Sequence, residues 1–99
     1  MSMEQAAKFA QEFSKNPSLQ KQLYNMLLDF TLSQDSLVQI AQEAGYDVEL
    51  EELITAFQQN AIAQESLRNV IKTDNLDPSS KMLSTSEFKS FATHFDVET

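Results

Sequence analysis

Four carboxylates in the middle of the chain are the side chains best placed to do chemistry. They are Asp47, Glu49, Glu51 and Glu52. Carboxylate oxygens bind hard divalent cations, and a group of them also forms a docking surface for a basic partner. Acidic side chains are equally favoured near a helix N-terminus, where the backbone dipole is positive. That structural role is the simpler interpretation. Partner binding is the functional candidate, and no metal site is predicted.

The charge around this group has a single sign. No lysine or arginine occurs over residues 22–67, whereas Asp29, Asp35, Glu43, Asp47, Glu49, Glu51, Glu52 and Glu65 all lie there. The whole chain carries 15 acidic residues against 7 basic ones, a net charge of −8. Nucleic acids and anionic membrane surfaces both require clustered cations, so the balance argues against either partner. It favours a basic protein surface, with a merely solvated acidic face as the alternative.

The other chemically capable residues lack the neighbours that catalysis or metal binding needs. His94 is the only histidine and there is no cysteine, so thiolate and multi-histidine sites are excluded. The stretch 74–87 has no central glycine, which a calcium loop requires. A triad of Ser86 or Ser90 with His94 and Asp96 has no supporting motif. We therefore predict no enzyme activity, no cofactor and no metal.

A stripe of aromatic residues near the end of the chain is the second candidate for partner binding. Phe88, Phe91 and Phe95 recur with Ala92 at helical spacing, in a helix expected over about 85–95. Packing over the helical core is the simpler interpretation. The alternative is an amphipathic helix that enters the groove of a partner or of a second copy of the chain, so homo-oligomerisation is left open.

The elements that position these residues are all predicted to be helices. We expect an all-α fold, a small bundle of four to five short helices without strands, over residues 3–15, 17–30, a short segment ending at Gly45, 49–72 and 85–95. Gly45 is the only glycine, placed where a helix end needs the left-handed conformation. A single helix over 49–72 is preferred to one broken near Asn60, because the interval contains neither glycine nor proline.

The location of the protein is predicted from what the chain lacks. No apolar run is long enough for a transmembrane helix or the hydrophobic region of a signal peptide. The absence of cysteine means that no disulfide is available. We therefore expect a cytoplasmic protein.

A series of short motifs covers residues 1 to about 59. These are the Met-Ser start, Ala7-Lys8-Phe9, Asn16-Pro17-Ser18-Leu19, Leu23, Val38, the run from Ile40 to Asp47, and Glu51-Glu52-Leu53. Together they resemble the Nif11 family, small proteins and leader peptides common in cyanobacteria and nitrogen-fixing bacteria. Because the motifs consist of capping and packing residues, the resemblance concerns the fold first. It implies a Nif11-like helical domain over 1–60, with 61–99 as a C-terminal helical extension that packs on it as one structural unit.

The resemblance also implies a function without catalysis. In one branch of the family the domain is the leader of a ribosomally made, modified peptide and is bound by peptide-modifying enzymes. In the other branch it is a standalone protein associated with nitrogen-fixing organisms. This chain has no Gly-Gly or Gly-Ala pair and no cysteine, which favours a standalone interaction protein that docks on a protein partner. The alternative is a precursor with a leader over 1–60 and a C-terminal substrate tail.

Overall fold

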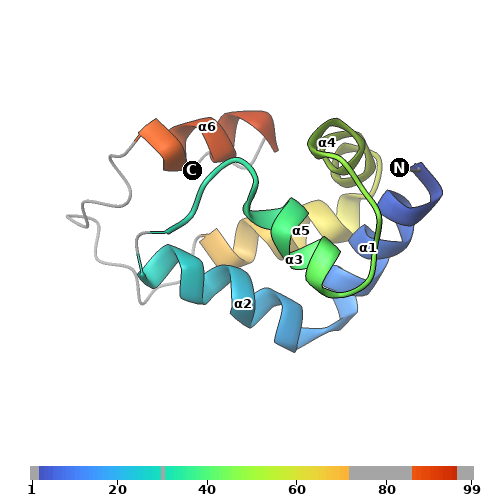
Figure 1. The fold of residues 1–99 in the computed structure, drawn as a ribbon, viewed down its shortest axis with the longest axis horizontal. Coiled ribbons are helices and arrows are strands. Elements are labelled where there is room, and N and C mark those ends of the chain that lie inside the picture. The colour runs from blue at the N-terminus through green and yellow to red at the C-terminus, as the bar shows by residue number, and fades with distance from the viewer. Residues whose placement is uncertain (1–2, 30, 72–85, 96–99) are drawn as a thin grey trace.

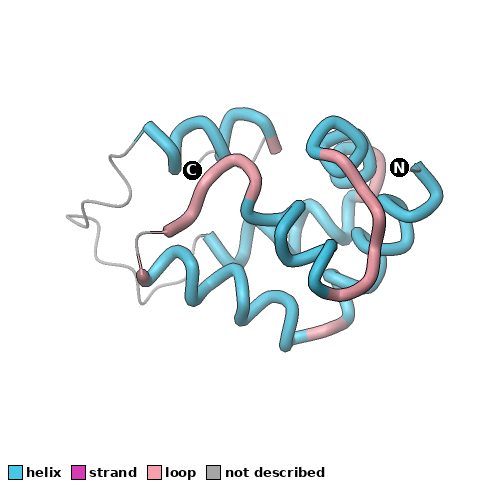
Figure 2. Tube along the Cα trace, in the orientation of Figure 1, coloured by secondary structure: helices cyan, strands magenta, loops and turns pink. Residues whose placement is uncertain are grey.

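The computed structural model describes residues 3–29, 31–71 and 86–95. Every regular element within these ranges is a helix (Figure 1, Figure 2). They are α1 (Met3–Lys15), α2 (Pro17–Leu28), α3 (Ser36–Glu43), α4 (Leu50–Gln58), α5 (Ala61–Ile71) and α6 (Ser86–His94). The predicted all-α class is confirmed. None of the described helices is long and apolar enough to cross a membrane.

The first two helices are divided where the sequence predicts. α1 buries Ala6, Phe9, Ala10 and Phe13. Asn16 then adopts an extended conformation, and its side-chain Oδ1 accepts a hydrogen bond from the backbone N–H of Ser18 at 2.9 Å. Pro17 occupies the first helical position of α2, where its missing N–H costs nothing. Phe30, the predicted end of α2, lies outside the described residues.

The start of α3 is stabilised by a side chain within the helix and not by one at the cap position. Asp35 occupies the cap position, but its side chain makes no capping hydrogen bond. The hydroxyl Oγ of Ser36 instead accepts from the backbone N–H of Ser33 at 2.8 Å, and Ser36 is 1% exposed. The buried side chain of Ser36, in the first turn of α3, therefore stabilises the connection that leads into this helix.

The end of α3 is built around Gly45, as predicted. Gly45 has φ +96°, in the left-handed region. The N–H of Tyr46 donates to the carbonyl oxygen of Ala41 at 2.9 Å, and that of Gly45 donates to Gln42 at 3.1 Å. These two bonds define a Schellman motif. The ring of Tyr46 then packs edge-on against Phe9 of α1, with centroids 5.5 Å apart, so the motif joins α3 to α1.

Replacing Gly45 with alanine is expected to lower the free energy of unfolding by about 1–2 kcal/mol, the usual cost of a left-handed residue with a Cβ atom. The added Cβ would meet no atom within 4 Å, so the cost is conformational and not steric. Urea denaturation of the wild type and of Gly45→Ala measures the difference in the free energy of unfolding. The matched variant Gly45→Asn should lose less, since asparagine enters this conformation more readily. Equal losses in the two variants would contradict the explanation.

The single helix predicted over 49–72 is wrong, because the chain breaks at Gln59 and Asn60. The side-chain Oδ1 of Asn60 accepts from the backbone N–H of Ala63 at 3.0 Å, and its carbonyl oxygen accepts from the N–H of Gln64 at 2.9 Å. Asparagine is among the strongest helix N-caps, so one helix can end and another begin without glycine or proline. This break raises the helix count of the described chain from the predicted four or five to six.

The core is centred on aromatic rings contributed by different helices. Phe57 of α4 lies 5.6 Å from Phe13 and 6.3 Å from Phe9, both of α1, measured between ring centroids. On its other side it meets Phe95, which directly follows α6, at 5.8 Å in an edge-to-face arrangement. All four rings are fully buried. Aromatic pairs at these distances add to the stabilisation that burial alone provides.

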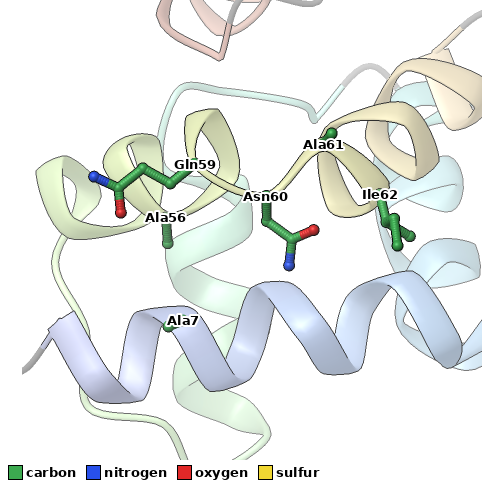
Figure 3. Close-up of a pocket in the computed structure, with 6 residues that line it drawn as sticks. All are labelled: Ala7, Ala56, Gln59, Asn60, Ala61 and Ile62. Carbon is green, nitrogen blue, oxygen red and sulfur yellow. The ribbon is translucent and has the colours of Figure 1, made fainter.

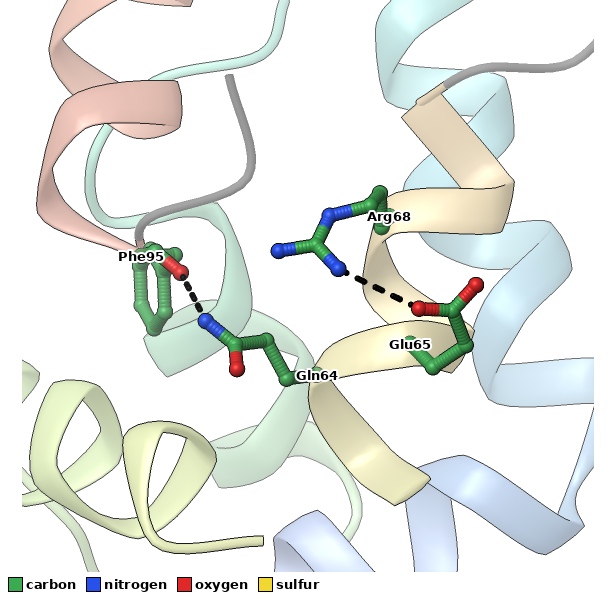
Figure 4. Close-up of polar contacts among 4 residues, drawn as sticks. All are labelled: Gln64, Glu65, Arg68 and Phe95. Carbon is green, nitrogen blue, oxygen red and sulfur yellow. Dashed lines mark hydrogen bonds and ion pairs between the residues drawn. The ribbon is translucent and has the colours of Figure 1, made fainter. Parts of the chain in front are cut away.

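The helices beyond residue 60 contribute to the same core. Their buried residues are Ala63, Leu67, Val70, Ile71, Phe91, Ala92 and Phe95. α5 packs on α1 and α2. The side-chain Nε2 of Gln64 donates to the carbonyl oxygen of Phe95 at 3.4 Å (Figure 4), and the hydroxyl of Ser90 donates to Gln34 Oε1 at 3.2 Å. Residues 72–85, between α5 and α6, lie outside the described residues.

Candidate functional site

The predicted acidic group lies in the connection from α3 to α4 and in the first turn of α4. Asp47, Glu49 and Glu51 are exposed, and Glu52 is half-buried. The carboxylate of Glu52 accepts from the backbone N–H of Glu49 at 3.0 Å, as in a capping box. Val48, which is 1% exposed, anchors the connection in the core. The structure thus brings these acidic residues together at one helix N-terminus and presents three of the four to solvent.

No metal centre is formed by the part of the chain that the structure describes. Within those residues, no group of three or more histidine, aspartate or glutamate side chains is arranged to hold an ion. The arrangement at the start of α4 is instead that of a helix cap, because the Glu52 carboxylate is directed back to a backbone N–H. What these carboxylates offer is a localised negative charge.

His94 lies beside Ser90 in α6, but the geometry does not make a catalytic pair. Its Nδ1 atom is 2.7 Å from the backbone carbonyl oxygen of Ser90 and 3.3 Å from the Ser90 hydroxyl. A carbonyl oxygen can only accept, so Nδ1 carries its proton and cannot take one from the serine. Asp96, the third residue of the candidate triad, and the side chain of Ser86 lie outside the described part of the chain.

Two residues of the aromatic stripe, Phe91 and Phe95, face the interior. Phe91 and Phe95 are both fully buried, and their ring centroids are 5.0 Å apart. Phe88 falls within α6, and its side chain lies outside the part that the structure describes. In this structure Phe91 and Phe95 close the helical core, which was the simpler interpretation of the stripe.

A shallow pocket that sequence reasoning missed lies where α4 ends and α5 begins (Figure 3). Its volume is about 440 Å³, and it is lined by Ala7, Ala56, Gln59, Asn60, Ala61 and Ile62. Figure 3 shows Ala56 of α4 opposite Ala7 of α1, with Asn60 and Ile62 beside them. The small alanine side chains and the turn between the two helices leave this space open. The shift in the apolar pattern after Asn60 was the signal that could have located it.

An exposed apolar side chain borders this pocket. Ile62, on its α5 side, is 71% exposed. Met3, which is 41% exposed, precedes the lining residue Ala7 by one helical turn on α1. Leu28, at the end of α2, is the other large apolar residue exposed in the described chain, and it does not line the pocket. The pocket therefore has one exposed apolar side chain, Ile62, at its edge.

Comparison with known proteins identifies the N-terminal half of the chain. The model of the Nif11 domain matches residues 1–53, which is more than half of the 99 residues. That region holds α1, α2, α3 and the acidic connection into α4. No curated protein and no solved structure matches the chain significantly. Nif11 is a family of precursor peptides and small helical proteins and not a known class of enzymes. The chain therefore belongs to the Nif11 family.

Proposed function

We propose that this chain is a non-enzymatic interaction domain that docks on a basic surface of a protein partner through its acidic segment, residues 47–52. The observation that carries the proposal is the placement of this segment. Its exposed carboxylates lie on a short connection held at one end by the Gly45 motif and at the other by the α4 cap. A preorganised connection loses little conformational freedom when a partner binds. We further propose a connection with nitrogen fixation, which rests on the name of the family and on the nitrogen-fixing organisms in which its members are common.

The physical contribution of such a segment is long-range attraction. Individual exposed ion pairs add little to binding free energy in water. A field of one sign raises the rate at which an oppositely charged partner arrives and orients it, and salt weakens the effect. Because no cation interrupts residues 22–67, the field around the segment is not cancelled locally along the chain. We therefore expect fast, salt-sensitive association.

The precursor interpretation requires residues 61–99 to be accessible to a modifying enzyme. Modifying enzymes need an accessible, extended substrate tail, whereas α5 and α6 bury residues such as Leu67, Phe91 and Phe95. This burial supports the interaction domain over the precursor. In the precursor interpretation the partner would be a peptide-modifying enzyme.

Neutralising the acidic segment is expected to weaken partner capture. The test uses the tagged full chain as bait in the producing organism, with quantitative mass spectrometry of the proteins retained. The double variant Glu49→Gln/Glu51→Gln should retain its partner about tenfold less at low salt, with a smaller difference at high salt. Asp29→Asn/Asp35→Asn changes the net charge equally at two exposed sites between α2 and α3, so it is the matched control. Equal loss in both variants would contradict docking through residues 47–52.

The same preparation tests the precursor interpretation through the intact mass of the recovered chain. An interaction domain predicts the mass of the unmodified sequence. Cleavage near residue 60, or a mass change confined to 61–99, would replace the proposed function with the precursor interpretation.

A further inference from the structure

We propose that the pocket between α1, α4 and α5 anchors one apolar side chain of a basic amphipathic helix, and that the acidic segment binds the lysine or arginine residues of the same helix. This inference rests on the proposed function and specifies the partner. The pocket is lined by Ala7 of α1, Ala56 of α4, Gln59 and Asn60 in the turn between α4 and α5, and Ala61 and Ile62 of α5.

The pocket is held open by bonds that do not depend on a ligand. Asn60 caps α5 through Ala63, and the N–H of Gln59 donates to Thr55 at 3.0 Å. The neighbouring Phe57 and Ala63 are fully buried, which ties both sides of the turn to the core. Ile62 nevertheless remains 71% exposed, so its side chain is accessible to a partner at the edge of the pocket.

The pocket and the acidic segment share one face of α4. Glu52, Ala56 and Gln59 follow one another at spacings of four and three residues, which places them along one side of the helix. Each turn advances about 5.4 Å. A ligand with an apolar group beside Ala56 therefore meets the carboxylate of Glu52 about one turn further along and that of Glu49 about two turns along. A partner helix repeats its side chains with the same period, so an apolar anchor with a cation one turn away matches this face.

Two features favour a basic helix over other occupants. The chain carries a net charge of −8, so a second copy would bring like charges together at the same face. The pocket is shallow and formed on the surface by Ala7, Ala56, Ile62 and their neighbours, whereas a small molecule needs a site that buries most of its surface. A side chain that projects from a helix needs only such a recess, because the rest of the helix covers the rim.

The test uses a designed peptide as the probe. It is an alanine-based helix of about 15 residues, long enough for partial helicity, with one leucine and a lysine one turn away on each side. The full-length, isotope-labelled chain is titrated with this peptide and followed by amide chemical shifts. We expect shifts at the pocket residues and over 47–52. Replacing the leucine with alanine, or the lysines with glutamine, should each weaken binding about tenfold at low salt.

Substitutions in the chain locate the site. Ile62→Ser is expected to weaken peptide binding about tenfold, as loss of a buried anchor contact does. Its melting temperature should be unchanged because Ile62 is mostly exposed. Leu28→Ser removes a comparable exposed side chain away from the pocket and should bind like the wild type.

The outcomes separate this inference from the proposed function. If Ile62→Ser binds the peptide like the wild type while Glu49→Gln/Glu51→Gln binds it more weakly, the pocket is not the anchor site. Docking through the acidic segment would still stand. Shifts at Ala7 and Ile62 that appear on raising the concentration of the chain alone would overturn this inference in favour of a second copy. Weaker binding in both variants, with Leu28→Ser unaffected, supports it. Modification of 61–99 in the producing organism would overturn the proposed function independently of the peptide.

Discussion

A chain that ends after Asn60 is expected to lose cooperative folding. The truncation removes the buried residues Ala63, Leu67, Val70, Ile71, Phe91 and Phe95. Loss of each large buried side chain costs about 2–5 kcal/mol, against a total stability of about 5–15 kcal/mol for a domain. The combined loss exceeds that total. Far-UV circular dichroism of residues 1–60 should show reduced helicity and a broad, non-cooperative thermal transition.

The control for the truncation is to add the missing part back. A fragment of residues 61–99, mixed with residues 1–60, should restore helicity if its buried side chains re-form the core. A cooperative melt of 1–60 alone, near the midpoint of the full chain, would contradict the expectation. That result would describe an independent leader and would favour the precursor interpretation.

Replacing Phe57 with alanine is expected to lower the free energy of unfolding by about 3–5 kcal/mol, among the largest effects of any single substitution here. Its ring contacts Phe9 and Phe13 on one side and Phe95 on the other, so its removal opens a cavity between α1, α4 and the end of α6. The surrounding rings come from separate elements and cannot all move in to fill the space. Urea denaturation followed by circular dichroism measures the change.

Two matched substitutions show whether the Phe57 effect comes from packing. Phe57→Leu keeps most of the volume and should cost less than the alanine variant. Ile62→Ala removes an exposed side chain of the neighbouring helix and should change stability by about 0.5 kcal/mol or less. A loss below about 1 kcal/mol for Phe57→Ala would mean that the packing of Phe57 against Phe9, Phe13 and Phe95 contributes little to stability.

Local features of this fold were predictable because they depend on residues a few positions apart. α1 covers Met3–Lys15 as expected from its apolar spacing, Pro17 begins α2, and Gly45 ends the α3 region in a left-handed conformation. The clustering of the acidic residues at the start of α4 follows from their positions in the sequence alone. The residues quoted for the Nif11 resemblance are of the same kind, and the family assignment agrees with them.

The helix break at Asn60 was not predicted from neighbouring residues alone. The change of apolar phase after this residue was visible, but the absence of glycine and proline favoured a continuous helix. The break accompanies a change of packing, because α4 places Phe57 against Phe9 and Phe13 of α1, while α5 packs on both α1 and α2. No single straight helix can satisfy both sets of contacts.

The sequence by itself determined the all-helical class, the start of α2, the end of α3, the acidic character of residues 47–52 and the Nif11 family. Only the tertiary structure decided that Phe91 and Phe95 are buried and that Ile62 borders a pocket facing Ala7. The physical reason is separation along the chain. Capping and charge follow from neighbouring residues, whereas burial and a shared surface exist only once distant helices have packed against one another.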